Sequence, residues 1–159
     1  LNIFKRKMWL DNVKCLDKKL AEDRGVWSTF DNTCGHIKIY ANAFKNSNAF
    51  FSPKAITVNS YGIREWASLY PFIEIVRIPE MLDYYRSKGL SYKKYLINKN
   101  YALRNFLNYF FKIIVSGKKG GLHYVNFYKH FFLNLLYPNA FLSFFYFLWR
   151  RLKKVLKNN

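Results

Sequence analysis

Residues 19–44 read KLAEDRGVWSTFDNTCGHIKIYANAF, and the interpretation of the whole chain starts from this segment. It places an acidic pair, Glu22 and Asp23, beside aromatic residues, a cysteine and a histidine, in a chain with only nine acidic residues. One hypothesis is that a carboxylate of this pair takes a proton from a hydroxyl as a general base. The alternative is that the pair accepts backbone N–H groups at the start of a helix. From His36 to Phe44 the pattern favours a strand or a short amphipathic helix.

Charge is segregated along the chain. Up to Asp83 there are 12 basic and nine acidic residues, whereas after Asp83 there are 15 basic residues and no acidic one. This asymmetry predicts a polyanionic partner for the second half, either nucleic acid or an anionic membrane surface.

The composition is typical of a folded and strongly aromatic protein. Of the 159 residues, 51% are hydrophobic and 21% are aromatic, which suits one ordinary domain with an ample core. Aromatic residues interleaved with Lys and Arg either stack on bases or lie at the interface of a bilayer. Composition leaves both kinds of partner open.

The two cysteines, Cys15 and Cys34, lie far apart and show no CxxC or Cys/His ligand spacing. They indicate neither a disulfide framework nor a zinc site, and a reducing cytosolic compartment is the default expectation. The chain begins at Leu1 with a basic, amphipathic segment that lacks the long apolar run of a signal peptide. We expect this start to lie in the interior of a longer protein.

The clearest predicted strand is Phe72–Ile78, which is rich in β-branched residues and bounded by two prolines. Shorter extended pieces are expected at Ala49–Ser52 and Ala55–Asn59. After Pro79 the sequence EMLDYYRSKG predicts a helix, with proline at its start and Gly89 just past its end.

The rest of the chain predicts apolar helices with basic edges. Ser91 is expected to cap the first, a second is expected to run from Tyr124 to Pro138, and a third leads into the basic cluster behind Trp149. Residues Phe131–Trp149 carry no charge over a length close to the roughly 20 residues of a spanning helix, but Pro138 interrupts them. We therefore expect two helices that lie at a membrane interface, with the basic cluster at the lipid headgroups.

Two short segments carry a resemblance to a known family. They are IFKRKMW at residues 3–9 and AEDRG at residues 21–25. With them, the first third of the chain resembles the later half of bacterial family 2 glycosyltransferases: the first segment looks like the strand and basic turn after the metal-binding region, and Glu22-Asp23 looks like the Glu-Asp motif. The resemblance implies an α+β fold, namely the C-terminal fragment of a GT-A-like α/β domain followed by an amphipathic, membrane-associating helical tail.

The resemblance also implies roles for individual residues. Asp23, next to Glu22, would deprotonate the acceptor hydroxyl in an inverting transfer from a nucleotide-sugar donor. A shifted alignment would place His36 near the acceptor instead, and a lone histidine on a strand also suits a structural role. The family's Asp-x-Asp motif, which holds Mn or Mg and the donor diphosphate, has no counterpart in this sequence. A divalent cation is therefore expected in the longer protein, with ligands outside this chain, and the chain alone is expected to be inactive.

These expectations divide the chain into residues 1–90, the C-terminal part of a catalytic domain, and residues 91–159, a basic, aromatic, helical membrane-docking region. The implied function is sugar transfer to a lipid-linked or other glycan acceptor in bacterial surface polysaccharide or lipopolysaccharide synthesis, at the cytoplasmic face of the inner membrane. The alternative is a non-enzymatic basic module that binds a membrane surface or nucleic acid. Nucleic acid is disfavoured, because Phe131–Trp149 would leave a large apolar patch exposed on a soluble protein.

Overall fold

Every regular element in the described part of the chain is a helix. The computed structural model describes residues 5–25, 27–45 and 67–158. The α+β fold class is wrong for these residues, which contain no strand and no GT-A-like α/β domain, and the extended pieces predicted at Ala49–Ser52 and Ala55–Asn59 lie outside them. The elements in chain order are α1 (Arg6–Asn12), η1 (Val13–Cys15), α2 (Lys18–Ala21), α3 (Phe30–Ala43), η2 (Ala67–Leu69), α4 (Tyr70–Phe72), η3 (Ile73–Arg77), α5 (Ile78–Ser87), α6 (Tyr92–Ala102), η4 (Leu103–Asn105), α7 (Phe106–Ser116), η5 (Gly117–Gly120), η6 (Leu122–Tyr124), α8 (Phe127–Leu135) and α9 (Pro138–Asn158).

The predicted strand Phe72–Ile78 is instead part of a helical run formed by α4, η3 and α5. The buried apolar residues of this run, together with Leu69 just before it, follow a helical spacing: Leu69, Phe72, Ile75, Val76, Pro79 and Leu82. Its prolines lie in the first turns of α4 and α5, where a missing N–H is tolerated. The π-helical turn η3 precedes Pro79 and widens the helix where the proline ring would otherwise meet a carbonyl.

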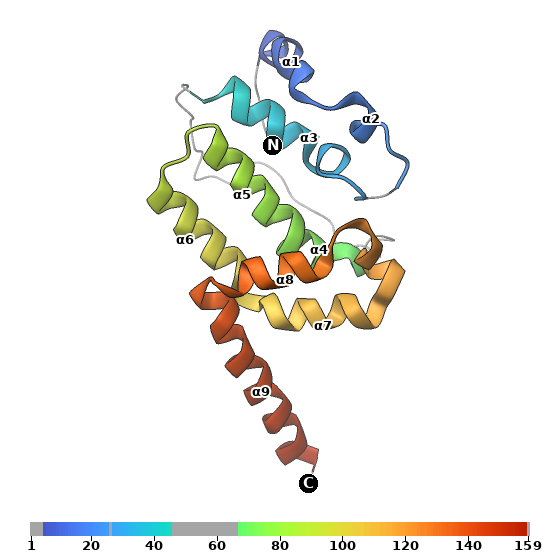
Figure 1. Cartoon of the computed structure of the whole chain (residues 1–159), viewed down its shortest axis with the longest axis vertical. Helices are drawn as coiled ribbons and strands as arrows, with labels where there is room; N and C mark the ends of the chain where they lie inside the picture. The colour runs from blue at the N-terminus through green and yellow to red at the C-terminus, as the bar shows by residue number, and fades with distance from the viewer. Residues whose placement is uncertain (1–4, 26, 46–66, 159) are drawn as a thin grey trace.

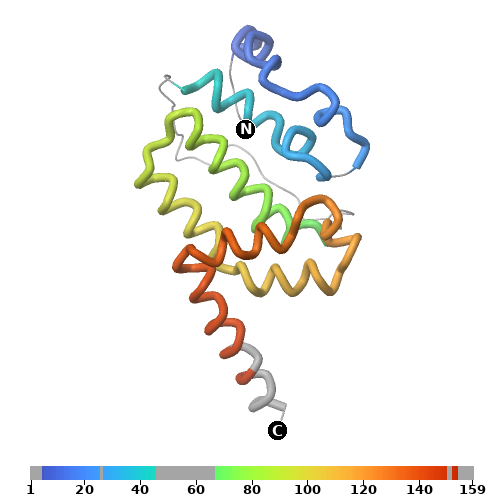
Figure 2. Tube along the Cα trace, in the orientation of Figure 1, coloured from blue at the N-terminus to red at the C-terminus, as the bar shows by residue number. Residues whose placement is uncertain are grey.

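The helices stack from one end of the molecule to the other (Figure 1). α1, α2 and α3 lie together at one end, α5 and α6 form an antiparallel pair in the middle, and α7 and α8 cross below this pair. α9 leaves this body and extends away from it, as the tube in Figure 2 also shows. The predicted division at residue 90 falls in the turn between α5 and α6, and the division itself stays a prediction.

Aromatic rings fill the core between α7 and α8. The ring of Phe110 lies 4.6 Å from that of Phe127 and 4.4 Å from that of Phe131, measured between centroids. Burying rings in this way is a large part of the stabilisation of such a core. The turn after η5 brings the backbone against this core: a Cβ on Gly121, whose φ is 84°, would lie 3.0 Å from the Phe72 ring. Only glycine fits there.

The helices predicted in the second half are confirmed in part, because the single helix expected after Ser91 is divided by the 3-10 turn η4 into α6 and α7. α5 ends at Ser87, Ser91 occupies the N-cap position of α6, and α8 ends at Leu135. The segment from His36 to Phe44, for which strand and helix were both open, lies mostly in α3.

Candidate functional site

Glu22 and Asp23 lie in the turn after α2 and not at the start of a helix. The exposed Glu22 carboxylate is 4.0 Å from the Lys18 ammonium, a surface pair that contributes little to stability. The Asp23 carboxylate accepts a hydrogen bond from the Gly25 N–H at 2.6 Å. This bond, with help from the Ser28 hydroxyl, holds the pKa of Asp23 below its ordinary value. Asp23 therefore closes a tight turn, and its assignment as a general base stays a prediction.

Arg77, for which we predicted no role, anchors the segment that follows this turn. Its side chain is buried, and its guanidinium donates hydrogen bonds to the carbonyls of Ser28 at 2.5 Å and Trp27 at 3.1 Å. Its other partner is the Glu80 carboxylate at 2.6 Å. Trp27 has a φ of 64°, which is rare for a residue other than glycine. Arg77 thus fixes an unusual backbone conformation against the start of α5.

His36 lies on α3 and not on a strand. Its exposed ring packs edge-to-face on the ring of Tyr40, with 6.0 Å between the centroids. In the described part of the chain, His36 forms no hydrogen bond or ion pair with Glu22 or Asp23. The three residues predicted from the sequence therefore do not form one hydrogen-bonded site in these residues.

Metal-ligating side chains are scattered over the described ranges. No three His, Cys, Asp or Glu residues there lie close enough together to hold a metal ion. Cys34 is half-buried in α3, and burial raises the pKa of its thiol to about 11, with Glu80 adding to the shift and Arg77 opposing it. At neutral pH this thiol is protonated and a poor nucleophile.

The outer sides of α7, α8 and α9 carry what we call the C-terminal apolar surface. Its exposed residues are Phe111, Ile114, Val115, Tyr128, Phe132, Leu133, Leu136, Phe141, Leu142, Phe144, Phe145, Tyr146, Leu148, Trp149 and Leu152. Along α9 from Pro138 to Trp149, only Ala140 and Ser143 are buried. A helix that is apolar around most of its circumference requires an apolar environment, which the rest of the described chain does not supply.

α9 is tied to the body by polar contacts near its start. The Asn139 N–H donates to the Asn100 side-chain oxygen at 2.7 Å, and the Asn139 amide donates to the Asn100 carbonyl at 3.0 Å. The buried Ser143 hydroxyl accepts a hydrogen bond from the Leu107 N–H at 3.1 Å. We did not predict these contacts, and the signal for them was the presence of small polar residues within an apolar run.

Pro138 marks a sharp change of direction. In the described residues no single helix is both long enough and apolar enough to cross a membrane. α8 and the Pro138–Trp149 part of α9 meet that requirement only when taken together, and they are bent by 100°. The predicted break at Pro138 is confirmed, since α8 ends at Leu135 and α9 begins at Pro138.

Comparisons with known proteins add no relative. No protein-family model, curated protein or solved structure matches the chain.

Proposed function

We propose that the chain docks on an anionic membrane surface through α8 and α9. The observation that carries this proposal is the C-terminal apolar surface, which continues directly into a basic end of the chain. Soluble monomers rarely expose apolar patches of this extent, and such patches are typical of interaction sites. A membrane interface accepts apolar side chains and basic groups side by side.

The excess of basic residues after Asp83 favours an anionic lipid surface over a protein groove as the partner. No acidic residue follows Asp83, and the apolar part of α9 leads into Arg150, Arg151, Lys153, Lys154 and Lys157. Each Lys or Arg close to an anionic leaflet contributes about 1 kcal/mol. Trp149, whose ring lies 5.0 Å from the Lys153 ammonium, stands at the junction, as aromatic residues do at bilayer interfaces.

The bend at Pro138 supports two helices lying in the interface over one helix that spans the bilayer. Two helices bent by 100° cannot cross the bilayer as one straight rod. With both helices flat, α8 contributes Phe132 and Leu133 while α9 contributes Phe141 and Phe145 to the same apolar layer.

Flotation of the whole chain with vesicles of phosphatidylcholine, with and without phosphatidylglycerol, tests this proposal. We expect binding to the anionic vesicles that salt weakens only in part, because burial of Phe and Leu persists when charges are screened. Equal affinity for both vesicles, or no binding to either, would contradict the proposal.

A double variant, Phe141→Ser with Phe145→Ser, tests whether the apolar side chains of α9 contact the membrane. Both rings are 53% exposed, so the fold should survive while vesicle affinity falls at least about tenfold, because full burial of one Phe contributes roughly 1.5–3 kcal/mol. The matched control replaces Leu10 and Ile97, which are 54% and 59% exposed on α1 and α6, by Ser. A loss of the same size in this control would show that the apolar surface of α8 and α9 is not specific.

A second candidate is that the docked chain is the acceptor-side part of an inverting glycosyltransferase. The observation that favours it is the position of Asp23, which is exposed, ionised and fixed by the Gly25 turn, so that an acceptor hydroxyl can reach it. The nucleotide-sugar donor and a Mn or Mg ion would be bound by parts of a longer protein. The isolated chain can be assayed with a panel of nucleotide-sugar donors, with and without Mn. Release of nucleoside diphosphate by this chain alone would contradict the proposal that the donor and the metal ion are bound by other parts of a longer protein.

A further inference from the structure

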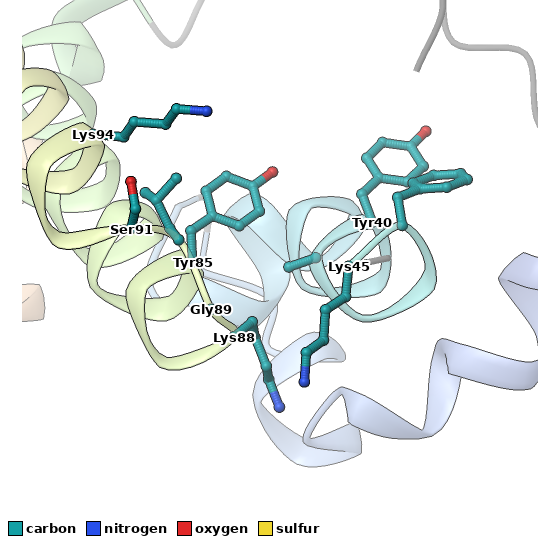
Figure 3. Close-up of a pocket in the computed structure, with 10 residues that line it drawn as sticks. Tyr40, Lys45, Tyr85, Lys88, Gly89, Ser91 and Lys94 are labelled. Carbon is teal, nitrogen blue, oxygen red and sulfur yellow. The ribbon is translucent and has the colours of Figure 1, made fainter. Parts of the chain in front are cut away.

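A hollow of about 630 Å³ opens where the end of α3 meets the turn between α5 and α6 (Figure 3). Tyr40, Phe44 and Lys45 come from the α3 side, and Tyr85, Lys88 and Lys94 come from α5 and α6. The volume falls within the range of about 300–1,000 Å³ that is typical of small-molecule sites. It is larger than a single inorganic ion needs.

The walls of this hollow are cationic. Lys45, Lys88 and Lys94 contribute three positive charges, and no acidic residue belongs to the described lining. The side chains of Lys45 and Lys94 form no hydrogen bond or ion pair with a described residue, whereas the Lys88 ammonium lies 5.3 Å from the centre of the Tyr84 ring. Lys45 reaches across from α3, since its Cε would lie 3.9 Å from a Cβ built on Gly89.

The helix ends around the hollow do not neutralise these charges. α3 and α5 end there and α6 begins there, and each helix end carries about half an elementary charge, negative at a C-terminus and positive at an N-terminus. The ends therefore sum to roughly −0.5 against three ammonium groups. The lysines exceed what is needed to offset the helix dipoles.

Two neutral groups supply further donors. The half-buried Tyr85 hydroxyl makes no hydrogen bond to a described residue, and Figure 3 shows it directed into the space between the two walls. Ser91 occupies the N-cap position of α6, but its hydroxyl makes no capping bond. Burial raises the pKa of Tyr85, so its hydroxyl keeps its proton at neutral pH.

From these contacts we infer that the hollow binds a phosphorylated organic molecule, with the phosphate held by Lys94 and the Tyr85 hydroxyl, while Lys45 and Lys88, whose ammonium groups lie on the other side of the hollow (Figure 3), attract it at longer range. Lysine is a common binder of phosphate, and charge-assisted hydrogen bonds of this kind are stronger than neutral ones. The site is separate from the C-terminal apolar surface, because α9 leaves the body at the opposite end of the molecule (Figure 1). It does not depend on the proposed docking.

Titration calorimetry on the whole chain, with three probes, tests the inference and identifies the source of the phosphate. ADP and pyrophosphate represent free phosphates, and monomeric dioctanoyl phosphatidic acid represents a lipid headgroup; adenosine and dioctanoylglycerol are their phosphate-free controls. Binding of any phosphate probe without binding of its control supports the site, and the probe that binds most tightly identifies the source. Absence of binding by all three phosphate probes would overturn it.

Variants locate the binding. Lys45→Gln combined with Lys94→Gln should weaken the affinity at least about tenfold, because the charge-assisted contact of Lys94 and the longer-range attraction of Lys45 are both lost. Tyr85→Phe, which removes only the hydroxyl, should weaken it by a smaller factor. The matched control is Lys93→Gln, on the same exposed turn as Lys94 but outside the lining, and it should change the affinity less than about twofold. Equal weakening by Lys93→Gln, with unchanged circular dichroism in all variants, would show diffuse electrostatic attraction and overturn the site.

Discussion

The N-terminal region, α1 to α3, and the C-terminal region, α7 to α9, are held together by different interactions. In the first, directional polar contacts dominate: the buried Asp31 carboxylate binds the Asp17 N–H at 2.7 Å and pairs with Lys38. In the second, rings stack on rings, and Phe111 lies 4.9 Å from Phe147. Polar contacts pair Asp17, Asp31 and Lys38 within the fold of the first region. Apolar packing leaves the second region with further apolar side chains on its outer face, where a partner can cover them.

Removal of Arg77 should cause the largest loss of stability. Arg77→Met leaves the carbonyls of Trp27 and Ser28 and the Glu80 carboxylate without their partner, so we expect unfolding to become easier by about 3–5 kcal/mol. Urea unfolding followed by circular dichroism measures this change. The control Arg86→Met, at an exposed position of the same helix, should cost less than about 1 kcal/mol. Equal losses would mean that the buried guanidinium does not anchor the N-terminal region.

A polar contact should also matter in the apolar region, although less. Ser143→Ala leaves the Leu107 N–H buried without its acceptor, which should cost about 1–3 kcal/mol. Ser116→Ala, at the exposed end of α7, should change stability by less than about 0.5 kcal/mol. Thermal unfolding of both variants measures the difference. A neutral Ser143→Ala would show that the Leu107–Ser143 hydrogen bond is not needed to hold α9.

His130 of α8, which faces Glu80 of α5, should make the stability of the C-terminal region depend on pH. Burial lowers the pKa of His130, and the positive charges of Arg77 and Lys99 lower it further. The Glu80 carboxylate, 3.8 Å away, and the Asp83 carboxylate raise the pKa, but they offset the effect of burial only in part. Because the folded pKa lies below the unfolded value, stability should be greatest above the ordinary histidine pKa of 6.5 and fall as the pH drops through the folded value. The slope contributed by one proton is at most about 1.4 kcal/mol per pH unit.

Urea titrations at several pH values check this slope. His130→Gln should flatten it between neutral and mildly acidic pH, whereas the exposed His36→Gln should leave it in place. A pH dependence of the free energy of unfolding that persists in His130→Gln would show that another titratable group causes it.

Asp23→Asn should have the smallest effect on stability, within about 0.5 kcal/mol, since Asn serves in such turns nearly as well as Asp. The exposed Asp11→Asn is the control, because Asp31 is buried and its replacement would break the pair with Lys38. In a longer protein that transfers sugar, loss of a general base would lower turnover about 10² to 10⁴-fold with unchanged stability. Near wild-type turnover would reject the catalytic role of Asp23.

Helix positions in the second half could be predicted because glycine, serine and proline residues there stand where helices begin or end. Gly89, Ser91 and Pro138 lie where α5 and α6 are separated and where α9 begins. The segment Phe72–Ile78 was mispredicted because β-branched residues between prolines are typical of strands, and this signal was given more weight than the helical spacing of Leu69, Phe72, Val76 and Leu82. There, tertiary packing of Phe72, Ile75 and Val76 decided the structure.

The candidate sites were harder to predict, because they depend on contacts between distant residues. The acidic pair was noticed since it is rare in this chain, but its geometry is that of a turn. Arg77 reaches carbonyls 49 and 50 residues away, and the Asn100–Asn139 contact spans 39 residues. The cationic hollow likewise joins Lys45 to Lys88 and Lys94. Periodicity within one segment carries no information about such pairs.

The attachment of α9 has a mechanical consequence. The contacts described between this helix and the body, at Asn139, Ser143 and Phe147, all lie in its first half, and the second half continues beyond them as a lever. With a rise of about 1.5 Å per residue, the chain beyond Phe147 extends roughly 15 Å from its last support. A tilt of about 10° at that support would displace the tip by about 3 Å. In the docked state that we propose, the Asn100–Asn139 and Leu107–Ser143 contacts would set the distance and the angle between the helical body and the membrane surface.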